Sequence, residues 1–306
     1  MTTRRPVILL LAALALAVPA ALPAAAGTNE VEFHYVFDRN PEWYYGQGNY
    51  LVTLRGNGFT SWGSFNYYVD IDFAPHHGTE TDSIYLEITP ILSLSKVFGM
   101  RTGRVLTDVG LTLQYNHGLL NGRYQLIPQA WLYGVVLSFG GRGMDILDVH
   151  LLRKEYKDYH ETYEIPYIDW WGYPQLATVH DVWPYEPGWQ LTVEWSKTWE
   201  TGRGHEIFAR GFCDWWRQEW AEVEQWPRYY PGQRFKGPTW LAPGGENKLM
   251  CQPQFGVRFG RDNQFALGTE MEYSRNLYRV PADDSRYLYE YDRDAFHWSL
   301  FLSARF

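Results

Sequence analysis

Long hydrophobic runs are missing from this 306-residue sequence once its first 26 residues are set aside. A membrane-spanning helix needs about 20 consecutive apolar residues. No later segment approaches that length, and the mean hydropathy of the chain is -0.38. Together these features exclude a helical membrane protein.

Basic residues are outnumbered by acidic ones. Lys and Arg together number 27 against 35 Asp and Glu, so the formal net charge is -8. Proteins that bind nucleic acids concentrate positive charge to meet the phosphate backbone. The sequence therefore predicts no nucleic-acid partner.

Cysteine occurs only twice, at Cys213 and Cys251. Both fall on the apolar face of neighbouring predicted strands, so they could form a disulfide, although their spacing does not require one. The sequence has no metal-ligand spacing, no phosphate-binding loop and no internal repeat beyond the alternation described below. We therefore predict no cofactor, no metal and no catalytic residues.

The N-terminus has the layout of a secretory signal peptide. Arg4 and Arg5 precede an apolar run over residues 7–18, and small residues follow up to Ala26. The run is too short for a membrane anchor. We predict a signal peptide over residues 1–26, which leaves 27–306 as one exported domain. The loss of two arginines takes the net charge from -8 to -10.

Strict alternation of apolar and polar residues is the main signal in the rest of the chain. Between Phe65 and Phe73 every second side chain is apolar, and the intervening positions include Asp70 and Asp72. The same period of two runs from Phe296 to Phe306. Successive side chains of a strand point to opposite faces. The apolar face would meet either a soluble core or membrane lipid.

Twelve segments alternate in this way, at 31–38, 48–58, 61–73, 83–96, 104–116, 125–139, 144–157, 188–199, 205–217, 247–260, 263–276 and 294–306. Most are longer than the five or six residues common in a soluble β-sandwich, and they suit tilted membrane-spanning strands of about 9–11 residues. Aromatics make up 18% of the chain, which suits the aromatic girdles of a membrane barrel. We predict an all-β, twelve-stranded antiparallel outer-membrane β-barrel, surrounded by lipid, in a Gram-negative bacterium.

The connections alternate between short and long, as in such barrels. The short ones fall near 59–60, 97–103, 140–143, 200–204 and 261–262. Two long ones, 158–187 and 218–246, are rich in Trp and Tyr. We expect these to be folded extracellular loops, which either form a lid over the lumen or pack on one another at its rim.

The polar face of the strands would line the lumen. It carries too many charges for a dry core, and by parity it also carries aromatic rings that can stack on a flat solute. The competing interpretation is that these groups pair and pack to brace or plug the barrel. The predicted solute-binding residues are Asp70, Asp72, Glu87, Tyr68, Tyr85, Phe212, Asp214, Glu270, Glu272 and Arg258.

Three segments resemble the nucleoside-specific, Tsx-like family of outer-membrane channels: residues 64–72 (SFNYYVDID), 84–90 (IYLEITP) and 92–96 (LSLSK). Residues 211–216, 252–255 and 268–273 are more similar to a branch of that family without an assigned function. The resemblance implies a monomeric twelve-stranded barrel with a narrow, substrate-selective pore. It also implies that Asp70, Asp72 and Glu87 lie in the lumen.

The function predicted from these features is a non-enzymatic, passive outer-membrane channel for small solutes, with nucleosides as the suggested class. One alternative is an outer-membrane acyl hydrolase, because His297 and Ser299 share a strand face. That face is the inner one, which is wrong for a lipid substrate. The other alternative is a non-conducting barrel whose loops bind a partner.

Overall fold

The computed structural model describes residues 27–37, 49–73, 81–100, 102–120, 129–141, 143–156, 159–168, 174–183, 188–202, 204–217, 247–275 and 294–306. The predicted signal peptide, residues 1–26, and the predicted loop 218–246 lie outside these ranges. The barrel strands are β1 (Gly27–Val36), β2 (Asn49–Phe59), β3 (Gly63–Phe73), β4 (Thr81–Ser93), β5 (Leu106–Leu120), β6 (Ala130–Phe139), β7 (Ile146–Tyr156), β10 (Gly188–Glu200), β11 (Glu206–Arg217), β12 (Asn247–Phe259), β13 (Phe265–Arg275) and β14 (Asp294–Arg305).

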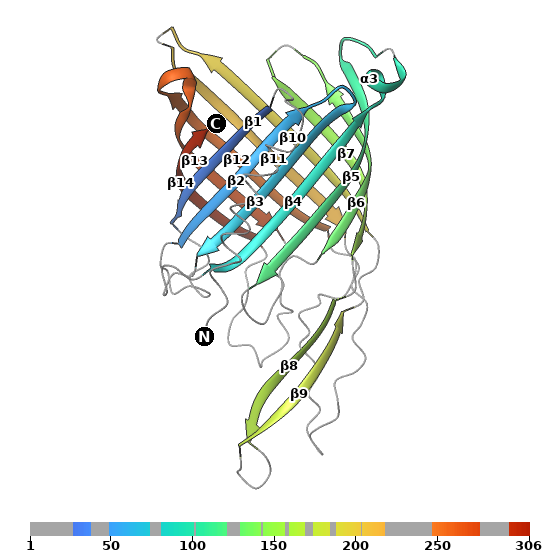
Figure 1. The fold of residues 1–306 in the computed structure, drawn as a ribbon, viewed down its shortest axis with the longest axis vertical. Coiled ribbons are helices and arrows are strands. Elements are labelled where there is room, and N and C mark those ends of the chain that lie inside the picture. The colour runs from blue at the N-terminus through green and yellow to red at the C-terminus, as the bar shows by residue number, and fades with distance from the viewer. Residues whose placement is uncertain are drawn as a thin grey trace.

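These twelve strands form one closed antiparallel barrel (Figure 1). Each strand pairs with its neighbour along the chain, except that β7 pairs with β10. The first and last strands close the sheet, with Val31 opposite Ala304 and His34 opposite Phe301. Closure leaves no strand edge to be covered. The predicted outer-membrane barrel and its number of strands are confirmed.

The five short connections gather at one end of the barrel, called the turn end below. Most are tight turns, but the connection after β4 contains a short helix, α3 (Leu94–Phe98). The predicted strand over 83–96 is therefore too long. Ser93 caps the helix by accepting a hydrogen bond from the Lys96 amide at 3.1 Å, and Gly99 ends it with φ 66°.

A second, two-stranded sheet lies within the predicted loop 158–187. It consists of β8 (Tyr159–Ile168) and β9 (Pro174–Trp183), paired antiparallel. Figure 1 shows this sheet beyond the barrel end opposite α3, which is called the loop end below. The expectation that this segment is folded is confirmed for its backbone. No helix in the described ranges has the length and apolarity that crossing a membrane requires.

The outer face of the barrel is apolar and exposed, as contact with lipid requires. Aliphatic side chains such as Leu113, Leu151 and Leu267 occupy its middle. Most exposed aromatic rings lie towards both ends, where the bilayer meets water. Those near the loop end are Tyr35, Phe37, Tyr50, Trp131, Trp189, Trp215, Phe296 and Trp298. Those near the turn end are Trp62, Phe98, Trp199, Phe259, Phe265 and Phe306.

The two cysteines are joined by a disulfide. Cys213 on β11 lies directly opposite Cys251 on β12, with their Cα atoms 4.1 Å apart. Both belong to the outward-facing set of their strands, since Asp214 and Gln252 beside them belong to the inward set. The bridge that the sequence left open is therefore formed, and it links the two strands that flank residues 218–246.

Candidate functional site

All ten predicted solute-binding residues belong to the inner face of the barrel. The register of β3 and β4 puts Tyr68 opposite Glu87, Asp70 opposite Tyr85 and Asp72 opposite Ser83. The register of β11, β12 and β13 puts the remaining inward positions on the other side of the lumen: Phe212, Asp214, Arg258, Glu270 and Glu272. The parity prediction therefore holds for each of them, but the structure divides them into groups with different surroundings.

Tyr68, Asp70, Tyr85 and Glu87 form a group that we call the tyrosine patch. The two tyrosine rings lie 6.2 Å apart, edge to face. The Tyr85 hydroxyl donates a hydrogen bond to Glu87 at 2.8 Å, and Thr53 donates one to Asp70. All four residues of the patch keep partial exposure. Rings and carboxylates are thus presented side by side to the lumen.

Across the lumen, the tyrosine patch faces more carboxylates. Glu87 on β4 interacts electrostatically with Asp214 on β11 and Glu194 on β10. The strands β5, β6 and β7 separate β4 from β10 in the barrel wall, so this interaction crosses the interior. Asp214 accepts a hydrogen bond from Thr192, and Glu272 accepts one from Gln252 at 3.0 Å. The lumen at this level is acidic.

An arginine crosslink, formed by Glu30, Glu32 and Arg210, spans the barrel nearer the turn end. Arg210 on β11 donates to Glu30 on β1 at 2.7 Å and also to Glu32. The strands β12, β13 and β14 lie between β11 and β1, so these contacts pass through the interior rather than along the wall. Arg55 adds an ion pair to Glu32 at 3.1 Å. The crosslink narrows the lumen with paired charges.

The predicted residue Arg258 lies at the wall and is buried. Its guanidinium lies over the Phe208 ring at 4.0 Å and 3.6 Å from Glu30. Phe208 and Phe301 are 2% and 1% exposed. Each ring covers a glycine of a neighbouring strand, because a Cβ at Gly256 would come within 2.6 Å of Phe208 and one at Gly268 within 2.4 Å of Phe301. These rings fill the wall. The bracing interpretation fits Arg258 and both phenylalanines.

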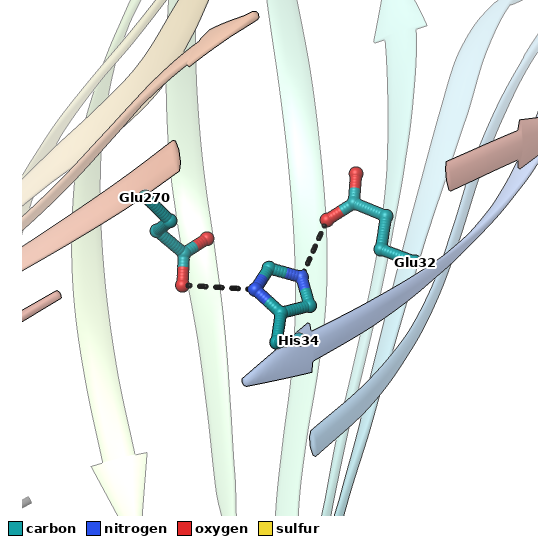
Figure 2. Close-up of side chains that lie close together, drawn as sticks. All are labelled: Glu32, His34 and Glu270. Atoms are coloured by element: carbon teal, nitrogen blue, oxygen red, sulfur yellow. Dashed lines mark hydrogen bonds and ion pairs between the residues drawn. The ribbon is translucent and has the colours of Figure 1, made fainter. Parts of the chain in front are cut away.

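The predicted residue Glu270 belongs to a buried cluster with Glu32 and His34. Figure 2 shows the His34 ring between the two carboxylates. Its Nε2 lies 3.0 Å from Glu32, its Nδ1 lies 3.0 Å from the Ser299 hydroxyl, and Glu270 is 4.0 Å away. Gln254 donates to both carboxylates, at 3.1 Å to Glu32 and 2.6 Å to Glu270. Both ring nitrogens of His34 therefore have partners.

The predicted hydrolase pair is organised differently from the sequence expectation. Ser299 lies on the inner face, as parity predicted, but its hydroxyl pairs with His34 rather than with His297. His297 lies opposite Glu272 in the β13–β14 ladder. Ser299 and His34 are both buried. The chain Ser299, His34, Glu32 has the residue types of a hydrolytic triad, but it lies inside the barrel wall and not on the lipid face.

Three inward-facing residues on β7 were not predicted from the sequence: Asp148, His150 and Lys154. They alternate on one face, opposite Glu194, Thr192 and Gly188 of β10. The parity rule would have found them, but the pair Leu151 and Leu152 interrupts the alternation in the middle of the strand. Leu151 faces outward and is exposed, whereas Leu152 faces inward and is buried.

Comparison with known proteins gives distant structural matches. No family model matches the chain, and no curated protein matches it. Among solved structures, the NanC porin is 8% identical, with 90% of this chain and 98% of that chain covered and a TM-score of 0.39. OmpT, an outer membrane protein of Vibrio cholerae, is also 8% identical, with 93% and 99% covered and a TM-score of 0.25. Matches this distant carry no argument about function, and the Tsx-like resemblance stays a prediction.

Proposed function

We propose that this protein is an outer-membrane channel for small solutes, and that its solutes are neutral, ring-containing and hydroxyl-bearing molecules of the nucleoside type. The observation that carries the proposal is the tyrosine patch. Aromatic rings can contribute about 1–3 kcal/mol per stacked base, and carboxylates accept hydrogen bonds from hydroxyl groups. The patch offers both groups within one part of the lumen, with partial exposure.

Three other inward aromatics support this choice by contrast. Phe208, Trp216 and Phe301 are buried, two of them against glycine, so they have no free face for a solute. Tyr68 and Tyr85 remain accessible. The proposal therefore rests on Tyr68 and Tyr85 and not on the inward aromatics as a group, of which Phe212 is also partly exposed. It includes a monomeric barrel in outer-membrane lipid of a Gram-negative cell, as the family resemblance implies.

The test is single-channel conductance of the refolded protein in a planar bilayer, with and without added nucleoside. We expect nucleosides to reduce the current, and Tyr85→Leu to weaken that block because it removes a ring and a hydroxyl. Phe208→Leu is a matched control, since it removes a buried inward ring. Current that nucleosides do not change would contradict the nucleoside proposal. A silent barrel would contradict the channel itself and favour a role in binding a partner through the loops.

Hydrolysis is a second candidate function, because Ser299, His34 and Glu32 are hydrogen-bonded in series. A hydrolase also needs backbone or side-chain donors for the oxyanion. The backbone around Ser299 is paired with β13 and with β1. The Glu32 carboxylate forms ion pairs with Arg55 and Arg210. We therefore expect no labelling of Ser299 by a serine-reactive fluorophosphonate. Labelling that Ser299→Ala abolishes would establish the hydrolase instead.

A further inference from the structure

A second group of acidic and histidine side chains lies on the lumen face of β7 and β10. Asp148 and Glu194 are directly opposite each other in the ladder, and His150 is the next inward residue of β7. One potential ligand atom from each of these three side chains lies within 4.8 Å of the other two. We call this group the β7–β10 cluster. The spacing between the three side chains is set by the pairing of β7 with β10, and no loop residue contributes to the cluster.

The state of His150 sets this cluster apart. The residue is 1% exposed, and neither its Nδ1 nor its Nε2 has a hydrogen-bond partner. Its nearest charged neighbour is Glu194, 4.0 Å from Nε2, which is too far for a hydrogen bond. Buried polar atoms are nearly always satisfied. An imidazole in this position, beside two carboxylates, has the arrangement of a ligand without its ion.

The charges around the cluster also favour a bound cation. Glu194 interacts electrostatically with Asp148 and Asp214, which are both acidic. No lysine or arginine in the described ranges forms an ion pair with Asp148 or Glu194. The nearby Lys154 is engaged elsewhere, with Gln190 at 3.0 Å and over the Trp216 ring. Two close carboxylates without a cation repel each other, and a bound cation would remove that repulsion.

The cluster of Glu32, His34 and Glu270 provides the contrast (Figure 2). It also combines one histidine with two carboxylates at similar spacing. There, however, Glu32 is held by Arg55 and Arg210, and His34 is hydrogen-bonded through both ring nitrogens. Guanidinium groups already supply the positive charge at that cluster. The histidine is thus hydrogen-bonded through both nitrogens in one cluster, whereas in the other both nitrogens of His150 lack a hydrogen-bond partner.

We propose that Asp148, His150 and Glu194 bind one divalent transition-metal ion of the zinc type in the lumen. One imidazole nitrogen and two carboxylate oxygens form a donor set that Zn²⁺ accepts. Calcium and magnesium favour six or more oxygen ligands, so they suit this set less well. Three protein ligands leave a fourth position open to the lumen, where water or a polar solute would bind.

The test is zinc titration by calorimetry of the refolded, tag-free protein in detergent, after treatment with a chelator. We expect one Zn²⁺ per chain with micromolar or tighter affinity, and a loss of about tenfold or more in affinity for His150→Ala and for Glu194→Gln. Glu270→Gln is the matched control, because it neutralises the acid of the other cluster, and its affinity should equal that of the unmodified protein.

Three results would overturn the proposal: no saturable zinc binding, unchanged binding in Glu194→Gln, or equal loss in Glu270→Gln. If His150→Ala fails to refold, anomalous scattering at the zinc edge from crystals of the unmodified protein decides the matter. A peak among the three side chains supports the site, and a peak only elsewhere contradicts it. Binding is measured without conduction, so this outcome is independent of the proposed channel function.

Discussion

At the scale of single residues, the size of the inward side chains shapes the lumen as much as their charge does. Gly256 and Gly268 face inward opposite each other on β12 and β13, and each lies beneath a phenylalanine ring from the strand on its other side. A side chain at either glycine would displace a ring into the lumen. The space that solutes can use therefore depends on two residues that carry no functional group.

Gly268→Ala should destabilise the barrel. The added Cβ would lie 2.4 Å from Phe301 and 2.6 Å from the Phe255 carbonyl oxygen. Overpacking of this kind costs about 1–3 kcal/mol. Gly103→Ala is the control, because nothing lies within 4 Å of its added Cβ. Urea unfolding in lipid vesicles measures both variants, and equal free energies of unfolding would show that the Phe301 ring moves aside at no cost.

Arg210→Met should destabilise the protein and widen its lumen together. The substitution removes the charge that pairs with Glu30 and Glu32 across the interior. A buried ion pair that loses one partner costs about 3 kcal/mol or more. We expect a lower free energy of unfolding and a larger single-channel conductance.

The control for Arg210→Met is Lys197→Gln at the turn end. Lys197 pairs with Asp145 at 2.8 Å, and both side chains are partly exposed. The hydrogen bond from Lys197 lowers the pKa of Asp145. Loss of an exposed pair changes stability by about 1 kcal/mol or less. An Arg210→Met barrel with unchanged conductance would show that the crosslink does not limit the passage.

At the scale of elements, the disulfide between β11 and β12 should add stability without directing assembly. The strands already form a continuous ladder from Glu206 opposite Arg258 to Arg217 opposite Asn247. The bridge closes a separation of 38 residues, for which loop-closure entropy gives about 4 kcal/mol. We expect the double variant Cys213→Ala, Cys251→Ala to form a barrel with the same mobility as the unmodified protein on a gel run without heating. We also expect it to unfold at a lower denaturant concentration.

Reducing agent provides the control for the double variant. It should lower the unfolding midpoint of the unmodified protein and leave that of the double variant unchanged. Failure of the double variant to form the barrel would show that the disulfide is needed for assembly.

Period-two alternation was enough to predict the strands, because lipid outside and polar groups inside impose opposite demands on successive residues. The prediction failed where the chain no longer has lipid on one side and the lumen on the other. Ser93 is a helix cap, and beyond it the chain leaves the barrel wall, so the predicted strand continued too far. The β8–β9 sheet lies outside the barrel and carries no comparable constraint.

The contents of the lumen were less predictable from the sequence than its wall. Parity put Arg210 and Glu32 on the inner face, but their contact joins residues 178 positions apart across the barrel. The same limit applies to His34 and His150. Both are inward-facing histidines near two acids, and only the three-dimensional arrangement shows that the first has hydrogen-bond partners and the second has none.

At the scale of the whole molecule, the balance of charge in the lumen should set ion selectivity. Carboxylates predominate in the described interior at the level of the tyrosine patch, where Lys154 interacts with Asp214 and Glu87 and the Arg55 guanidinium lies 5.3 Å from the centre of the Tyr68 ring. A passage lined by one sign of charge concentrates ions of the opposite sign. We expect a channel that prefers K⁺ over Cl⁻ in a salt gradient.

Neutralising the carboxylates at this level should reduce that preference. The combined variant Glu87→Gln, Asp214→Asn removes two facing charges, so its reversal potential should move towards zero. Asp262→Asn is the control, because that residue is exposed in the turn between β12 and β13 and lies outside the lumen. Anion selectivity in the unmodified protein, or an equal shift in the control, would mean that the described carboxylates do not line the conducting path. Salt screens the electrostatic effect of a charge over a Debye length of about 10 Å at 0.1 M. The reversal potential therefore reports the charges that lie close to the conducting path.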